Sequence, residues 1–350
     1  MGNTYLEGNY APVADEATIT ELHVTGTLPT ELTGRYLRNG PNPVTAPDPD
    51  RYHWFSGDGM VHGLRLDGGR ACCYRNRWVR SGSVARALGE SCPDELLEDR
   101  NLHGPNTNVI SHAGRTLAIV EGGGRPYELT DELDTVGPTD LDGTLDGGYT
   151  AHPKLDPRTG ELHAISYYWG WGNEVRYTVV DPSGRVSSQR SVGTTGSPMV
   201  HDMSLTERYA VVYDLPVVFD VDAAMAGSTM PYAWDDDYPA RLGFVPRAGG
   251  EGRPGGNDPR FVFPARWAPP AGPSGAGPSN STPARCARSC STTTTRSSRG
   301  WTSASSVGGT ATATRPCRCP APAASTTAAS SSTTPSPGPP MSSTSDPVPG

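Results

Sequence analysis

Apolar and polar residues alternate along much of the first 265 residues, and turn-forming residues interrupt the alternation at short intervals. A period of two is typical of a β-strand with one buried face, whereas an amphipathic helix repeats about every 3.6 residues. We expect strands at 117–120, 161–167 (a half-buried strand), 177–180 and 209–213, with turns at 156–160 and 181–184. Almost no helical pattern separates them. The sequence therefore predicts an all-β fold: a propeller, barrel or sandwich.

The composition agrees with a turn-rich β protein and excludes several functions. The 350 residues include 42 Gly and 35 Pro, and only 35% are apolar. No run of about 18 apolar residues is present, which argues against a membrane span. The first ten residues lack the pattern of a signal peptide, and the three cysteines before residue 270 are expected to be free thiols, so we expect a cytoplasmic protein. A net charge of −8 argues against nucleic acid as a partner.

The composition changes abruptly near residue 265. Of the 37 acidic residues only Asp346 lies beyond residue 270, and no histidine follows His201. We interpret 1–265 as the folded part and 266–350 as a Ser/Thr/Ala/Pro-rich tail. Three explanations of the tail stay open: a mucin-like stalk, a disordered regulatory extension, or translation out of frame. One Lys against 28 Arg indicates a GC-rich gene, and a shift of one base would turn the Ser/Thr run at 291–298 into an acidic turn. We favour the frameshift, with the slip between residues 248 and 270.

Two histidines are candidates for metal binding. His152 precedes the predicted turn at 156–160, and His201 precedes the predicted strand at 209–213. They lie 49 positions apart, which is about one propeller blade. Equivalent positions of successive blades face a common axis, so the two imidazoles could bind one axial iron, copper or zinc ion. On spacing alone, two hydrogen-bonded loop histidines are the favoured explanation of the pattern.

Several sequence blocks resemble the carotenoid oxygenase family and occur in that family's order. They are Gly34–Pro43, His53–Gly63, Tyr74–Arg80, Asn106–Val109, Glu121, Ala151–Lys154, His201–Asp202, Tyr213–Pro216 and Arg241–Arg247. The resemblance implies a seven-bladed β-propeller with non-haem Fe(II) held on the axis by four histidines. It makes His152 and His201 the first two ligands, and Glu121 a carboxylate that orients a ligand imidazole through its other ring nitrogen.

The same resemblance implies a reaction. Family members use dioxygen to cleave one carbon–carbon double bond of a carotenoid, apocarotenoid or stilbene, which gives two carbonyl products. The expected partners are therefore dioxygen and an apolar polyene or stilbene-like substrate. In that family an apolar patch that touches a membrane usually caps the substrate tunnel, so the resemblance implies peripheral contact with a membrane. No obligate protein partner is implied.

The chain departs from the family after His201. The family's third histidine, expected soon after Arg266–Trp267, and its fourth, near the C-terminus of a longer chain, are both missing. We therefore expect an incomplete propeller of about four blades at 1–265. Two alternatives to an active dioxygenase stay open: a catalytically inactive propeller fragment, and a propeller scaffold without enzymatic activity.

Overall fold

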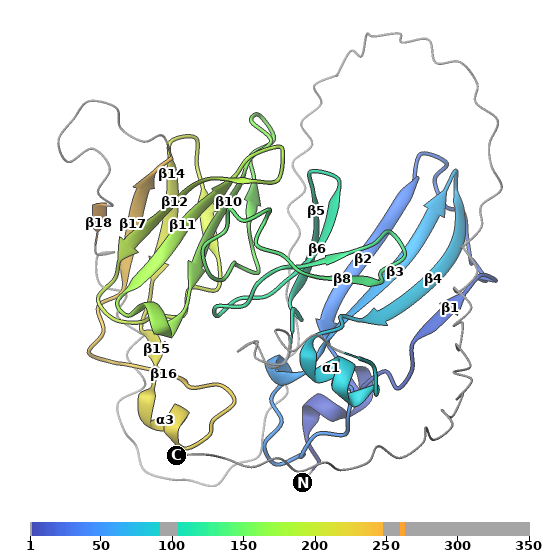
Figure 1. The fold of residues 1–350 in the computed structure, drawn as a ribbon, viewed down its shortest axis with the longest axis horizontal. Helices are drawn as coiled ribbons and strands as arrows, with labels where there is room; N and C mark the ends of the chain where they lie inside the picture. The colour runs from blue at the N-terminus through green and yellow to red at the C-terminus, as the bar shows by residue number, and fades with distance from the viewer. Residues whose placement is uncertain (1, 92–103, 248–259, 263–350) are drawn as a thin grey trace, which may run out of the picture.

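Antiparallel sheets with tight turns dominate the computed structural model, which describes residues 2–91, 104–247 and 260–262 (Figure 1). The first sheet contains β1 (Ala17–Ile19), β2 (Gly34–Pro41), β3 (Gly59–Asp67) and β4 (Arg70–Trp78), in the order β1-β4-β3-β2. Gly68 and Gly69, at φ of 52° and 78°, form the two-residue turn between β3 and β4. Residues with a side chain rarely adopt positive φ angles such as these, which explains why both turn positions are glycine.

Three further four-stranded sheets follow along the chain. The second contains β5 (Asn108–His112), β6 (Arg115–Ile119), β7 (Tyr127–Leu129) and β8 (Thr135–Pro138). The third contains β9 (Lys154–Leu155), β10 (Leu162–Tyr167), β11 (Glu174–Val180) and β12 (Val186–Gly193). The fourth contains β13 (Met203–Leu205), β14 (Tyr209–Asp214), β17 (Arg241–Pro246) and β18 (Arg260–Val262).

The connections contain a hairpin and a few short helices. The hairpin consists of β15 (Val217–Phe219) and β16 (Tyr232–Trp234). The described α-helices are α1 (Gly82–Ala87) and α3 (Val221–Met225), and the 3₁₀ turns are η1 (Thr4–Leu6), η2 (Gly8–Tyr10), η3 (Trp54–Ser56) and η4 (Trp169–Trp171). No helix in the described part of the chain combines the length and the apolarity needed to cross a membrane.

The sheets pack face to face, and the third sheet is covered on both sides. Ile165 and Tyr167 of β10 belong to a buried cluster shared with Val212 of the fourth sheet. Leu162 and Ala164 of the same strand belong to another cluster, which includes β6 of the second sheet. All six residues of β10 are buried. The prediction of a half-buried strand is therefore wrong, because alternate side chains enter two different cores.

Edge strands of the first and second sheets face each other, and so do edge strands of the third and fourth sheets. The strands β2, β5, β9 and β13 are edge strands of their sheets. In addition, β2 contacts β5, and β9 contacts β13. We call this row of strands the inner edge.

The structure confirms the predicted fold class, an all-β chain with four successive blade-like sheets, and the sheets do not close into a ring within the described residues. The predicted strands and turns correspond to β6, β10, the β11–β12 hairpin and β14. The prediction of free thiols is wrong for Cys72 and Cys73, which are both disulfide-bonded. The predicted tail at 266–350 lies outside the described residues.

Candidate metal centre

The two candidate histidines meet at the inner edge. His152 lies two residues before β9, and His201 lies two residues before β13. Because these strands are neighbours, the two imidazole rings approach to 4.4 Å between centroids, with 67° between their planes. Two donors 49 positions apart in the sequence therefore lie close enough to share one ligand.

Glu121 contacts one of these histidines. It follows β6, and its carboxylate oxygens lie 2.9 and 3.0 Å from Nδ1 of His201. Nδ1–H therefore donates to the carboxylate, which leaves Nε2 of His201 with a lone pair available to a metal. The hydrogen bond to Glu121 raises the pKa of His201 above its usual 6.5. The His201 side chain is 53% exposed and that of Glu121 15%.

His152 offers a buried nitrogen without a partner. Its Nε2 is buried and makes no hydrogen bond within the described part of the chain. Burial, followed by the positive charge that His201 can carry, lowers the pKa of His152. The ring is therefore held in its neutral form, which is the form that binds a metal ion. An unsatisfied buried imidazole nitrogen beside a second imidazole fits a metal such as iron better than it fits a packed core.

Two tyrosines surround Glu121 from the third sheet and the hairpin. Burial raises the pKa of Tyr167 well above 10, and the charge of Glu121 and a hydrogen bond with it raise it further. Burial and the charge of Glu121 also raise the pKa of Tyr232. Both phenols therefore stay protonated near neutral pH, and the Tyr167 hydroxyl can donate to the carboxylate. Sequence analysis missed both residues: the alternation around Tyr167 indicates only a strand, and no strand was predicted at Tyr232.

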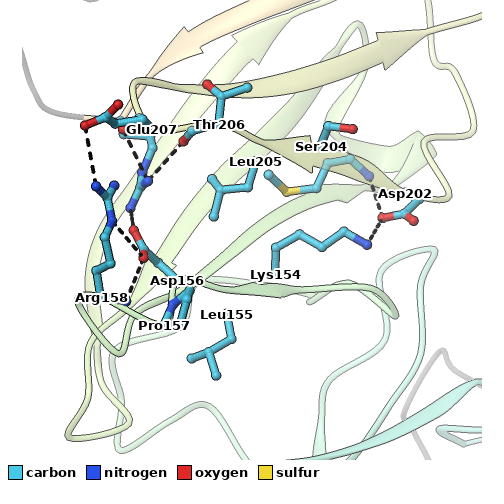
Figure 2. Close-up of a pocket in the computed structure, with 12 residues that line it drawn as sticks. Lys154, Leu155, Asp156, Pro157, Arg158, Asp202, Ser204, Leu205, Thr206 and Glu207 are labelled. Atoms are coloured by element: carbon cyan, nitrogen blue, oxygen red, sulfur yellow. Dashed lines mark hydrogen bonds and ion pairs between the residues drawn. The ribbon is translucent and has the colours of Figure 1, made fainter. Parts of the chain in front are cut away.

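An ion pair lies next to the histidines. The Lys154 ammonium lies 2.7 Å from Oδ1 of Asp202 (Figure 2), and the same oxygen accepts a 2.6 Å hydrogen bond from the backbone N–H of Met203. Burial acts to raise the pKa of Asp202, but the hydrogen bonds from Lys154 and Met203 and the charges of Lys154 and His152 together outweigh it, so the pKa is lowered below 3.8. Both residues belong to blocks of the family resemblance, yet sequence analysis gave them no role.

A cleft of about 590 Å³ separates the start of β9 from the start of β13 (Figure 2). Charged side chains line it, and most of them are paired. Asp156 accepts hydrogen bonds from the Arg247 guanidinium and the Arg158 backbone N–H, which lower its pKa to about 2. Arg158 also pairs with Glu207 at 3.4 Å. Ion pairs therefore border the cleft, and Leu155, Met203 and Leu205 also line it.

The remaining described histidines near the sheets have other partners. His62 contacts the Tyr74 hydroxyl at 2.7 Å, His112 contacts the carbonyl of Asp181 at 2.7 Å, and His163 contacts the Tyr177 hydroxyl at 2.8 Å. Across the described residues, no three His, Cys, Asp or Glu side chains converge on a metal position. The described residues thus bring together two imidazoles and one supporting carboxylate.

Comparison with known proteins identifies the relationship. Residues 10–267 match the family described as retinal pigment epithelial membrane protein. A carotenoid cleavage oxygenase of Mycobacterium tuberculosis is 49% identical over an alignment of 288 positions, and the match covers 71% of this chain and 58% of that protein. The chain belongs to the carotenoid oxygenase family. It spans little more than half the length of the relatives it matches.

Solved structures of the carotenoid oxygenase family share the fold. The lignostilbene dioxygenase of Pseudomonas brassicacearum superimposes with a TM-score of 0.65 at 32% identity, covering 74% of this chain and 55% of that one. A cobalt-substituted apocarotenoid oxygenase of Synechocystis superimposes with a TM-score of 0.58 at 25% identity, covering 72% of this chain and 57% of that one. The second structure contains cobalt on a related fold.

Proposed function

We propose that this chain supplies His152 and His201 as ligands of a non-haem Fe(II) centre in a dioxygenase. The enzyme would cleave one carbon–carbon double bond of a carotenoid, apocarotenoid or stilbene-like compound to two carbonyl products. The observation that carries the proposal is the pair of imidazoles 4.4 Å apart, one oriented by Glu121 and the other with a buried, unpaired Nε2. The described residues supply two of the four expected ligands.

Each residue has a distinct part in this proposal. Iron(II), when bound, supplies dioxygen binding and activation next to the substrate double bond. His152 presents a neutral Nε2, because burial disfavours its charged form. Glu121 fixes the tautomer and orientation of His201 by accepting from Nδ1–H, and makes the imidazole a stronger donor. Tyr167 in turn holds the Glu121 carboxylate.

An exposed apolar group supports the expected contact with a membrane surface. Val221 and Met225 of α3 are 61% and 84% exposed, and Trp234 of the adjacent hairpin is 62% exposed. Val221 and Trp234 line one pocket together with Asp220, Asp222, Asp235 and Asp236, and α3 lies below β15 and β16 near the bottom of Figure 1. We call the exposed side chains of Val221, Met225 and Trp234 the apolar projection. We propose that a cytoplasmic enzyme receives its apolar substrate by peripheral contact of this projection with a bilayer.

A metal titration tests the ligand assignment. We would titrate the purified chain with Co²⁺, whose visible absorption reports coordination, and compare it with His152→Ala and His201→Ala. The exposed His23 supplies a matched control, His23→Ala. We expect each ligand variant to weaken Co²⁺ binding at least about tenfold and the control to bind as the parent does. Equal binding by all four proteins would refute the assignment.

The alternatives give different results in the same preparation. An active enzyme loaded with Fe(II) converts an apocarotenoid or a stilbene to aldehydes under air. An inactive propeller fragment binds Co²⁺ weakly through two imidazoles and forms no aldehyde. A scaffold without enzymatic activity binds no metal, and His152→Ala leaves its melting curve unchanged. One observation favours the inactive fragment and the scaffold: the described residues bring together only two imidazoles.

A further inference from the structure

The inner-edge strands that follow the two histidines are short. β9 contains two residues and pairs with β10 through only Leu155 and Lys154. β13 contains three residues. Each of these strands forms few backbone hydrogen bonds with its neighbour. Because such hydrogen bonds fix a strand in its sheet, the ends of β9 and β13 are weakly fixed. The separation of the two histidines therefore needs another constraint.

The Lys154–Asp202 ion pair supplies a direct link between these two strand ends. Lys154 lies two residues after His152, and side chains two apart in an extended segment point to the same side. Asp202 directly follows His201 and accepts from the N–H of Met203, which fixes the carboxylate at the start of β13. The 2.7 Å contact therefore joins the segment of one histidine to the segment of the other.

We propose that Lys154 and Asp202 are positioning residues for the metal centre, whose ion pair sets the distance between the His152 and His201 rings. The inference rests on the proposed function for its purpose, but the distance itself does not depend on a metal. The pair is partly exposed, with side chains 35% and 46% accessible. Such pairs contribute little to stability, so its effect is expected on ring geometry rather than on unfolding.

Another ion pair in the same cleft provides a matched control. Arg158 and Glu207 also link the third and fourth sheets, at 3.4 Å, but lie at the opposite end of the cleft from Lys154 and Asp202 (Figure 2). A general effect of linking the two sheets would appear in variants of either pair. A positioning effect would appear only in variants of Lys154 and Asp202.

The metal-free test measures the nuclear Overhauser effect between the two imidazole rings in ¹³C-histidine-labelled protein. Rings 4.4 Å apart give a cross-peak. We expect Lys154→Met and Asp202→Asn to lose most of its intensity, and Lys154→Arg and the control Arg158→Met to keep it. Full intensity in both single variants, or equal loss in Arg158→Met, would overturn the proposal.

A Co²⁺ titration of the same proteins separates this inference from the proposed function. If the parent binds Co²⁺, Lys154→Met and Asp202→Asn should weaken binding about tenfold, and Lys154→Arg should restore it to within about threefold. Unchanged affinity in the single variants would refute the positioning role. If the parent binds no Co²⁺, the proposed function fails, and the cross-peak still decides whether the ion pair sets the ring distance.

Discussion

The buried His163 ring lies 3.1 Å from the Arg247 guanidinium, which donates from Nη2 to Nε2 of the imidazole. Nδ1 then carries the proton and donates to the Tyr177 hydroxyl at 2.8 Å. The contact joins β10 of the third sheet to the residue that follows β17 of the fourth. It requires a neutral imidazole, because a protonated ring would direct a second N–H at the arginine.

This contact predicts that stability falls on acidification. Burial and then Arg247 lower the pKa of His163, against the opposing charges of Glu161 and Asp156. The unfolded chain therefore takes up a proton near pH 6.5, before the folded chain does, and stability present above that pH is lost as pH falls below it. Urea denaturation at pH 7.5 and 5.5 measures the loss. The variant His163→Gln, which cannot titrate, should lose less stability between the two pH values than the parent does. An equal loss in the variant and the parent would contradict the prediction.

A second prediction concerns the fully buried carboxylate of Asp214. Its Oδ2 pairs with Arg241, and its Oδ1 accepts a 2.5 Å bond from the Tyr238 hydroxyl. Asp214→Ala leaves the arginine without its partner and should lower the free energy of unfolding by about 3–5 kcal/mol. Tyr238→Phe removes one hydrogen bond and should cost about 1–2 kcal/mol. Asp222→Ala, at an exposed acid of α3, is the control and should change little. Equal losses at Asp214 and Asp222 would contradict this ranking.

A third prediction compares two apolar residues of the third sheet. Ile165 of β10 is 2% exposed, and Leu155 of β9 is 57% exposed. Ile165→Ala should lower the free energy of unfolding by about 2–5 kcal/mol, because removing the side chain would leave a cavity between the third and fourth sheets. Leu155→Ala should change it by less than about 0.5 kcal/mol. Chemical denaturation of both variants measures the difference, and similar values would show that the third and fourth sheets do not pack as described.

A fourth prediction concerns a close backbone contact in the loop that follows Glu121. A Cβ added to Gly148 would lie 2.4 Å from the carbonyl of Gly123, two residues after Glu121. Gly148→Ala should therefore push the Glu121 loop outward, cost about 1–3 kcal/mol of stability and weaken Co²⁺ binding. Gly193 has open space at the same position and supplies the control Gly193→Ala. Co²⁺ affinity in Gly148→Ala equal to that in the control would contradict the expected displacement.

Much of the fold was predictable from local patterns. The hairpin at 177–186 carries its own turn residues, and the alternation at 161–167 fixed a strand there. What the alternation could not show is that both faces of β10 are buried. A single sequence does not say whether the polar-looking face of a strand meets water or another sheet. His163 illustrates this, since it is buried with one partner in β11, Tyr177, and another, Arg247, directly after β17.

The candidate site was predictable only in part. Spacing alone allowed His152 and His201 to be unrelated, and the family resemblance supplied the expectation that they meet. Lys154 and Asp202 carried no independent signal, because a charged residue near a turn is usually solvated. Tyr167 was also missed, since its contact with Glu121 depends on the packing of two different sheets.

The double burial of β10 restricts how this chain can vary in length. Successive residues of the strand serve two cores in turn, so an insertion or deletion of one residue would exchange the two sets of side chains. Ala164 would then replace a larger residue on one side, and Ile165 or Tyr167 would enter the space built for a small one on the other. Natural variants should therefore keep the strand at constant length and place their insertions in the loops on either side of it.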